Sequence, residues 1–364
     1  MGARPLCIER LGVRGFRNLA PLELAPGPGF NVVHGDNGAG KSNLLEAIQY
    51  LGSLRSFRSA RTDDLIQLGE DAAVLEARVS GEAAPRRFRV ALGRGKTRRL
   101  ALDGKRPRSI ATWHTAIQTV LFHPGDVALA GGPPEGRRAL LDRILEQIDP
   151  TYATTLSSYQ KALRSRNRLL KQEGVQRQAV RAYDGLLASA GEVIGRARSR
   201  LVPDLGERAT AAFREVVGEA LPLEVSYAPR IEPDAEAIRA ALAASFDKDV
   251  ARGFTADGPH ADDVALRVRE VAARHHASQG QQRAIVLALK VAELDVLTRR
   301  TGRVPILLLD DVSSELDRAR NRRLFEVLGG LGGQVFLTTT HPEFILLERN
   351  RLDLHVEEGR IHRG

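Results

Sequence analysis

The sequence predicts an α/β protein in which a mixed β-sheet with flanking helices is built from both ends of the chain, with a mainly helical lobe inserted between them. Two apolar strands support this: one runs into a glycine-rich turn near the N-terminus, and the other ends in two carboxylates near the C-terminus. Between them, apolar residues recur at spacings of three and four, which is typical of helices. In a chain of 364 residues we expect a head formed by residues 1–124 and 252–364 and a lobe at 125–251.

The N-terminal part predicts strands and one strongly amphipathic helix. Residues 8–34 read as short extended segments, and the last of them, Phe30–Val33, predicts a buried strand. A glycine-rich turn then opens a helix that carries apolar residues from 44 to 51. Further strands are expected at 72–80 and 86–93, followed by a charged hairpin that turns at Asp103-Gly104.

The rest of the chain changes pattern twice. Long helices are expected over about 135–220, interrupted by Pro150 and Pro203, and a strand follows at 221–229. The C-terminal part then predicts an apolar helix, a strand, a second helix, a second strand and a closing strand pair. Their expected ranges are 281–297, 304–310, 318–328, 334–339 and about 352–361.

Composition limits the class of protein. The formal net charge is +9 and arginine far outnumbers lysine, which suits phosphate-rich partners but also fits an arginine-rich codon bias with solvated faces. The single cysteine, Cys7, excludes an internal disulfide and a cysteine-based zinc site. No apolar run is long enough to span a membrane and no signal sequence is evident, so we expect a soluble, cytoplasmic protein without a membrane partner.

A phosphate-binding loop is the most specific motif. The residues match G-x-x-x-x-G-K-[ST] between a strand and a helix: Gly35, Asp36, Asn37, Gly38, Ala39, Gly40, Lys41 and Ser42. Glycines let backbone N–H groups turn toward phosphate oxygens, and the helix N-terminus adds positive potential. We expect Lys41 to reach the β- and γ-phosphates and Ser42 to bind Mg²⁺. The alternative is a glycine-rich turn with an exposed lysine.

A second site lies at the end of the strand Ile306–Leu309, where Asp310 and Asp311 follow. A carboxylate at the end of a buried strand beside the phosphate loop holds Mg²⁺ in P-loop NTPases, and we assign that role to Asp310. Asp311 is expected to orient or polarise an attacking water. Acids in this position can also simply cap the following turn.

A third element precedes the long apolar helix, where Ser278, Gly280 and Gln281 form an S-x-G-Q sequence. Free N–H groups at a helix start can bind an anion, although a serine here is often an ordinary N-cap.

The order of these three elements resembles that of ATP-binding-cassette (ABC) ATPases. The resemblance implies an ABC-type P-loop head that binds ATP and Mg²⁺ and forms a head-to-tail homodimer. In such a dimer, Ser278, Gly280 and Gln281 of one copy would cap the γ-phosphate held by the other. It also implies that residues 314–317 cross the dimer interface, and that His341 is a catalytic switch residue that contacts the γ-phosphate.

Within that class the chain resembles the RecF family, which is related to the heads of SMC proteins. The matching pieces extend over nearly the whole length, and the most specific are Gly258-Pro259-His260 and Ser278–Arg283. Two departures stand out. Ala261 replaces the arginine that usually follows Gly-Pro-His, and no glutamine occupies the Mg²⁺-binding position after strand 119–122, where His123 and Pro124 are found.

The resemblance implies a nucleotide-switched clamp on double-stranded DNA near single-strand gaps, with slow, DNA-stimulated ATP hydrolysis. Its partners would be RecR and RecO, and indirectly RecA, in repair, replication restart and SOS induction. Basic side chains would supply the contacts to DNA phosphates, and the candidates are Arg55, Arg58, Lys96, Arg98, Arg99, Lys105, Arg106, Arg164, Arg168 and Lys171. A transporter ATPase or an SMC-like structural ATPase is the alternative, but the wide motif spacing and the short lobe disfavour both.

Overall fold

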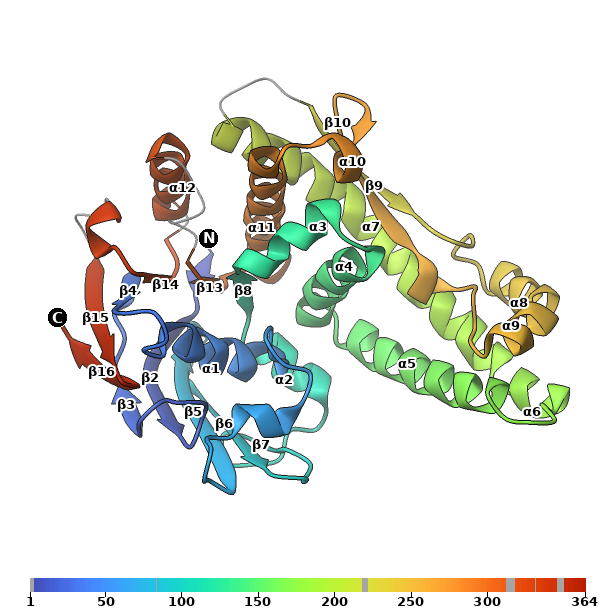
Figure 1. The fold of residues 1–364 in the computed structure, drawn as a ribbon, viewed down its shortest axis with the longest axis horizontal. Coiled ribbons are helices and arrows are strands. Elements are labelled where there is room, and N and C mark those ends of the chain that lie inside the picture. Colours follow the sequence, from blue (N-terminus) through green and yellow to red (C-terminus); the bar gives the residue numbers. More distant parts are fainter. Residues whose placement is uncertain (1–2, 83, 218–221, 312–317, 331, 346–349) are drawn as a thin grey trace. The chain divides into compact units, whose positions relative to one another are not determined.

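A computed structural model of the chain describes residues 3–82, 84–217, 222–311, 318–330, 332–345 and 350–364 (Figure 1). The chain forms two compact units. Unit 1 contains Met1–Asp126, Ala212–Glu219 and Lys290–Gly364, and unit 2 contains Val127–Ala211 and Ala220–Leu289. The chain returns to unit 1 at residue 290, whereas the boundary drawn from the sequence lies at 252.

Unit 1 is an α/β head with two main sheets. The first has six strands in the order β16-β15-β4-β14-β13-β8, all parallel except for β16, which pairs antiparallel with β15. This sheet confirms the predicted strands of both chain ends. Its strands are β4 (Phe30–His34), β8 (Thr119–Phe122), β13 (Ile306–Leu309), β14 (Val335–Thr339), β15 (Arg351–Glu357) and β16 (Arg360–Arg363).

The second sheet of unit 1 is antiparallel, in the order β3-β2-β5-β6-β7. Its strands are β2 (Cys7–Arg14), β3 (Leu22–Leu24), β5 (Ala72–Ser80), β6 (Arg86–Gly93) and β7 (Arg99–Leu102). The predicted hairpin is confirmed: Asp103 and Gly104 both have positive φ, and Leu102 and Lys105 close the turn with paired backbone hydrogen bonds. A small parallel pair, β1 (Arg4–Pro5) with β12 (Arg303–Val304), completes the strands of unit 1.

Helix α1 (Lys41–Ser53) is buried nearly all round, because its apolar side chains join one hydrophobic core with residues of both sheets. That burial stabilises a helix that begins without a side-chain cap. Helix α2 (Ile110–Ala116) adds Trp113, whose indole N–H donates to the carbonyl of Leu51 at 2.7 Å. The other helical elements of unit 1 are η1 (Thr62–Leu65), α12 (Arg318–Gly330) and η5 (Pro342–Phe344).

Gln334 joins the two sheets of unit 1 through its fully buried side-chain amide. Its Oε1 accepts from the N–H of Ile8 at 2.8 Å, and its Nε2 donates to the carbonyls of Ile8 at 3.1 Å and Gly27 at 2.8 Å. Ile8 belongs to β2, while Gln334 directly precedes β14. The Gln334 amide therefore provides the hydrogen bonds to the backbone of Ile8 that a neighbouring strand would provide.

Unit 2 is mainly helical. It contains α3 (Ala128–Gly131), α4 (Pro134–Ile148), α5 (Pro150–Leu170), α6 (Arg177–Arg181), α8 (Ala235–Ala244), α9 (Phe246–Arg252), η3 (Pro259–Ala261) and α10 (Ala273–His276). Its sheet joins β9 (Leu223–Ala228), β10 (Asp263–Val268) and the short β11 (Val271–Ala272). The short η2 (Pro124–Val127) and the long helices α7 (Asp184–Val217) and α11 (Gln279–Thr301) each contain residues of both units.

The expected break at Pro203 is wrong, because α7 continues through this residue. A proline inside a helix removes one hydrogen bond and costs about 3 kcal/mol. Leu201, Val202 and Leu205 are all buried around it, and their packing outweighs that cost. Pro150, in contrast, stands at the first position of α5 as expected.

A buried ionic network fixes the interior of unit 2 around Arg198. Its guanidinium contacts Asp142 at 2.9 Å and Asp262 at 3.3 Å, and all three side chains are nearly inaccessible. Burial and the charge of Asp142 raise the pKa of Tyr152, whose hydroxyl donates to that carboxylate. Removing one partner from such a pair leaves an uncompensated buried charge.

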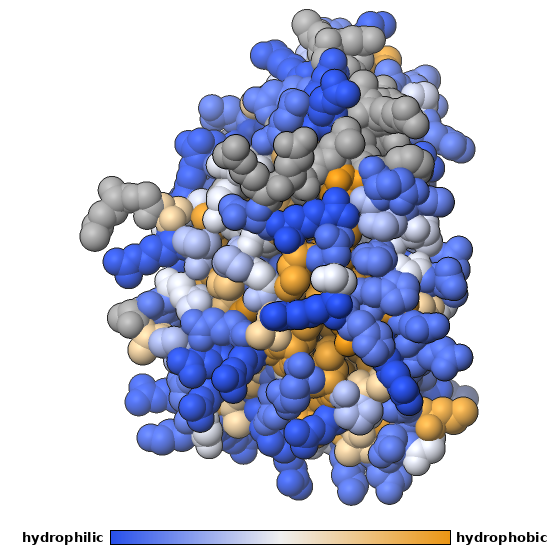
Figure 2. Space-filling view, turned by 90° about the vertical axis from the view of Figure 1, so that its left-hand side faces the viewer, coloured by the Kyte–Doolittle hydropathy of each residue, from blue (hydrophilic) through white to orange (hydrophobic). Residues whose placement is uncertain are grey.

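Hydrophilic side chains dominate the face drawn in Figure 2, and hydrophobic ones are exposed in its lower centre. Within the residues that the structure describes, no helix is both long and apolar enough to cross a bilayer.

His114 makes the stability of unit 1 dependent on pH. Burial lowers its pKa to about 4, although its ring nitrogen contacts the carbonyl of Gly52 at 3.3 Å. The unfolded-state pKa is about 6.5, so protonation favours the unfolded chain and stability is lost as pH falls from about 6.5 toward 4. Between pH 7.5 and 5.0 we expect the wild type to lose about 2 kcal/mol more free energy of unfolding than His114→Gln. Urea titrations at both pH values measure this difference, and equal losses in the two proteins would contradict it.

Candidate nucleotide-binding site

The predicted phosphate loop connects β4 to α1, so its backbone N–H groups lie at the N-terminus of a buried helix. Gly35 has φ +141, and an added Cβ would lie only 2.2 Å from the carbonyl oxygen of Val356. Gly40 has φ +123 and directly precedes the first helical residue. Only glycine adopts such backbone conformations without strain, which explains the glycines at these two positions.

Lys41 folds back over the loop. Its ammonium donates to the carbonyl oxygens of Gly35 at 2.7 Å and Asp36 at 2.8 Å. Burial lowers the pKa of Lys41, against the opposing influence of the carboxylates of Asp311, Asp36 and Asp310. The cation therefore lies within reach of the phosphate loop and close to both acids that follow β13.

Asp310 lies beside the phosphate loop because β13 and β4 both pair in parallel with β14. Its Oδ1 accepts from the hydroxyl of Ser42 at 2.7 Å and from that of Thr338 at 2.8 Å. The Thr338 hydroxyl also accepts from the N–H of Asp311 at 2.9 Å, and Asp311 has φ +51. A hydroxyl and a carboxylate in direct contact are the hard oxygen ligands that Mg²⁺ prefers, so Ser42 and Asp310 fit this ion.

A cavity of about 190 Å³ opens over these groups. Its lining includes five of the predicted loop residues and Asp311, which places that carboxylate where a substrate or water can reach it. Four further residues line it that the sequence motifs did not assign to nucleotide: Asn43, Arg58, Thr338 and Thr340.

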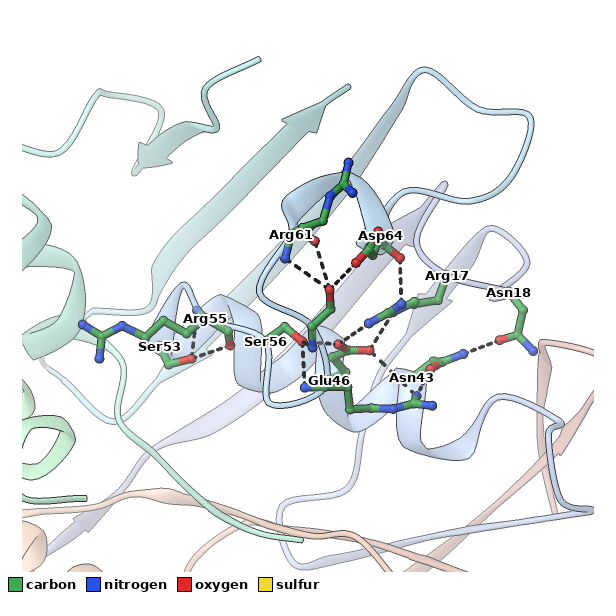
Figure 3. A network of polar contacts seen from close by, with 11 residues as sticks. Arg17, Asn18, Asn43, Glu46, Ser53, Arg55, Ser56, Arg61 and Asp64 are labelled. Carbon is green, nitrogen blue, oxygen red and sulfur yellow. Dashed lines mark hydrogen bonds and ion pairs between the residues drawn. The ribbon is translucent and has the colours of Figure 1, made fainter. Parts of the chain in front are cut away.

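Glu46 organises one wall of the site. The carboxylate is fully buried on α1 and accepts two hydrogen bonds from Arg17, at 2.9 and 2.8 Å, and one from Ser56 at 2.5 Å. Arg58 lies 4.0 Å from the same carboxylate and donates to Asn43 at 2.5 Å. Figure 3 shows these side chains converging from α1 and from the segments before β4 and after α1.

Asn18 links this wall to the phosphate loop. Its Nδ2 donates to the carbonyl of Gly38 at 3.1 Å, and its Oδ1 accepts from Asn43 at 2.6 Å. The loop is thus held from outside by side chains of its own unit.

Ser278 and Gln281 cap α11 in the structure. The hydroxyl of Ser278 accepts from the N–H of Gln281 at 3.2 Å, and Gln281 Oε1 accepts from the N–H of Ser278 at 2.9 Å. This reciprocal arrangement is a capping box. These residues form the start of a helix in unit 2. Ser278 is exposed there and Gly280 is half-buried. Their capping of a second copy's nucleotide stays a prediction.

His341 lies after β14 and is exposed. Its Nδ1 is 3.1 Å from Glu343 Oε1, and it is not among the residues that line the cavity. Its predicted contact with the γ-phosphate is therefore untested. The predicted interface segment, residues 314–317, lies outside the described residues.

Comparison with known proteins identifies the family. The model for the RecF/RecN/SMC N-terminal domain matches residues 7–361. A DNA replication and repair protein RecF from Anaeromyxobacter sp. (strain Fw109-5) is 42% identical over 344 residues, covering 92% of each chain. The chain belongs to the RecF family. A RecF from Geobacter sp. (strain M21) is 36% identical and covers 97% of this chain and 98% of its own.

Solved structures agree with this assignment. A structure of the recombination mediator protein RecF with ATPrS, from the RecFOR pathway, has a TM-score of 0.88 at 29% identity and covers 100% of this chain and 99% of its own. An SMC head bound to the C-winged helix domain of ScpA has a TM-score of 0.59 at 15% identity, which shows a shared fold. The predicted ABC/SMC-type head with a helical insertion is confirmed.

The basic residues selected as DNA contacts lie in different places. Arg55 and Arg98 are both close enough to His114 to lower its pKa, so they share one region of unit 1. Lys96, Arg99, Lys105 and Arg106 are exposed around the β6–β7 edge. Arg58 instead lines the cavity. The remaining three are exposed in unit 2: Arg164 and Arg168 lie on α5, and Lys171 directly follows this helix.

The two departures from the RecF pattern have different consequences. His123 follows β8 beside Phe57, with ring centroids 5.0 Å apart, and its Nε2 is 3.5 Å from Asp126 Oδ1. It does not line the cavity, so no Mg²⁺ ligand is assigned there. Next to Ala261, Asp262 contacts Arg198 and Asp263 contacts Arg137 at 2.7 Å. Both carboxylates therefore form ion pairs with arginines of unit 2.

Thr338 was not singled out in the sequence, and its hydroxyl connects Asp310 to the backbone of Asp311. Thr338→Val should remove the hydrogen bonds that the Thr338 hydroxyl forms with the N–H of Asp311 and with the carboxylate of Asp310, which costs about 1–3 kcal/mol of unfolding free energy. It should also weaken binding of Mg²⁺-ATP, measured by calorimetry. Thr338→Ser is the matched control because it keeps the hydroxyl, and a serine variant as impaired as the valine one would refute this role.

Proposed function

We propose that this chain is an ATP-dependent clamp on double-stranded DNA that acts in the cytoplasm in recombinational repair. The observation that carries the proposal is the contact between Ser42 and Asp310, which joins the phosphate loop of β4–α1 to the acidic end of β13. Family membership supplies the context: RecF relatives are named for DNA replication and repair, and a solved RecF is described with ATPrS.

The residues of the cavity fit a slow Mg²⁺-dependent ATPase. Backbone N–H groups of residues 35–42 would bind the phosphates, and Lys41 would turn from its carbonyl partners to the β- and γ-oxygens. Ser42 and Asp310 would hold Mg²⁺, which when bound neutralises charge that develops on the phosphates. Asp311, at the cavity wall, would orient the attacking water.

Dimerisation would make ATP a switch. An exposed capping-box start of α11 offers the hydroxyl of Ser278 and nearby N–H groups to an anion. We assign these groups to the γ-phosphate of a second copy, with His341 completing the site from the phosphate-loop side. A dimer held by nucleotide would then open after hydrolysis, which DNA would stimulate.

The basic residues favour a duplex ligand with little sequence preference. In the described part of the chain, Arg164, Arg168 and Lys171 are exposed and form no ion pair, so their charge is available for phosphate contacts. We infer that the clamp binds duplex near a single-strand gap and works with RecO and RecR, which would load RecA there. Replication restart and SOS induction would depend on that step.

A transporter ATPase is the weaker alternative, since the chain belongs to the RecF family. An SMC-like structural protein is also disfavoured because the described helices reach at most the 34 residues of α7, far too few for a long coiled coil.

Ser278→Arg tests the dimer. A bulky cation at the helix start should spare ATP binding by the monomer but block ATP-dependent dimerisation, because two copies could no longer approach. Lys41→Ala is the comparison variant and should lose ATP binding itself. Equilibrium dialysis with labelled ATP and light scattering measure the two steps separately. If Ser278→Arg dimerises with ATP as the wild type does, the capping role is excluded.

A triple variant that removes three positive charges tests the duplex contact: Arg164→Ala, Arg168→Ala and Lys171→Ala. The slope of the logarithm of the DNA-binding constant against the logarithm of salt concentration should become less steep by about 0.9 for each lost phosphate contact. For all three contacts together the change should be about 3. Filter retention of a labelled 40-base-pair duplex with ATP, at several salt concentrations, measures this slope. Arg177→Ala is the matched control because Arg177 is paired with Asp247 at 2.7 Å. An unchanged slope in the triple variant would place the DNA elsewhere.

A further inference from the structure

The outer face of the five-stranded sheet carries an unfavourable charge arrangement. Arg10 on β2 is directly opposite Arg78 on β5, and Arg78 is directly opposite Arg87 on β6. Like charges at opposed positions of an antiparallel sheet destabilise it. A sequence that breaks a local rule in this way commonly does so at a functional site.

A hollow of about 610 Å³ lies at this row of arginines. The next row across the sheet explains its depth: Gly12 has no side chain and Ala101 a short one, at positions whose neighbours are long. The hollow has the size of a ligand or peptide site. Its lining includes Arg10, Arg78, Arg87 and Arg89, together with the acids Glu23, Glu76 and Asp103.

The acids of this face are already paired. Glu76 contacts Arg89 at 2.7 Å and Glu23 contacts Arg14 at 3.5 Å. Asp103 contacts Arg86 at 2.6 Å and also accepts from the backbone N–H of Arg87.

Two arginines of the hollow have guanidinium groups without an ion pair among the described residues. Arg78 contacts Glu9 at 2.8 Å. The guanidinium groups of Arg10 and Arg87 form no hydrogen bond or ion pair with any residue that the structure describes, although the charge of Arg87, after its backbone N–H and Arg86, helps to lower the pKa of Asp103. Both side chains are exposed at the hollow. They stand on strands separated by one strand, about 10 Å apart.

We propose that this hollow binds an acidic, extended peptide segment of a partner protein, with one carboxylate on Arg10 and another on Arg87. A segment in the polyproline II conformation, with three residues per turn and a rise of about 3.1 Å, places residues i and i+3 on one face about 9 Å apart, which matches the spacing of the two strands that carry the cations. Guanidinium pairs with carboxylate through two parallel hydrogen bonds, and the recess provides room for the side chains between the acids.

Charge complementarity favours a peptide over duplex DNA on this face. A duplex presents a continuous array of phosphates, about one charge per 1.7 Å of axis. Such an array would lie against the carboxylates of Glu23, Glu76 and Asp103 as well as the arginines. A peptide with two acids meets the two unpaired cations and leaves the existing ion pairs intact.

The test uses the full-length protein and a fluorescein-labelled hexapeptide library with Asp or Glu at positions 1 and 4 and varied residues elsewhere. We expect saturable binding of selected members, measured by fluorescence anisotropy. The double variant Arg10→Ala, Arg87→Ala should weaken it at least about tenfold. Ala101→Tyr, which fills the hollow while keeping every charge, should weaken it similarly. Arg360→Ala, which removes an exposed arginine of β16 in the other sheet, is the matched control and should bind normally.

Three results would overturn the proposal: no saturable binding by any library member, undiminished binding by both the double variant and Ala101→Tyr, or equal competition by inorganic phosphate or by duplex DNA. Binding should not require nucleotide, so Lys41→Ala should bind the selected peptides as the wild type does. This separates the peptide site from the ATP-dependent clamp, whose failure would leave the anisotropy result unchanged.

Discussion

The adjacency of β4 and β13 to β14 in one parallel sheet is the constraint on which the rest of unit 1 depends. Parallel strands bring their carboxyl ends to one edge, so the loop after β4 and the acids after β13 meet although 268 positions separate Ser42 from Asp310. The strand between them contributes Thr338, whose hydroxyl contacts Asp310. The chemistry of the site is therefore a consequence of strand order.

The position of α1 explains why the site can be rigid. Its apolar residues belong to a core shared with both sheets, and the same helix carries the polar residues Lys41, Ser42, Asn43 and Glu46. Glu46 is buried yet fully engaged by Arg17 and Ser56, so the desolvation of its charge is offset by short charge-assisted bonds. Packing and polar contacts thus position the same few residues.

Much of this architecture could be predicted because its signals are local. The phosphate loop has fixed spacing, the apolar strands have distinct periodicity, and Asp103-Gly104 specifies a turn through its own backbone preferences. Thr338 was missed because its role depends on the pairing of β13 with β14, which no single segment reveals. The place of Arg58 at the cavity could not be predicted either, because charge in a sequence does not identify its partner. Its contact with DNA stays a prediction. Pro203 was misjudged since tertiary burial overrode a local preference.

Gln334 gives the head a mechanical property. Its amide is bound to backbone groups of β2 and of the segment before β4, and it directly precedes β14, the strand that contributes Thr338 to the cavity. Sliding one sheet past the other would break three bonds in a place that water does not reach. These three buried bonds therefore resist displacement of one layer against the other.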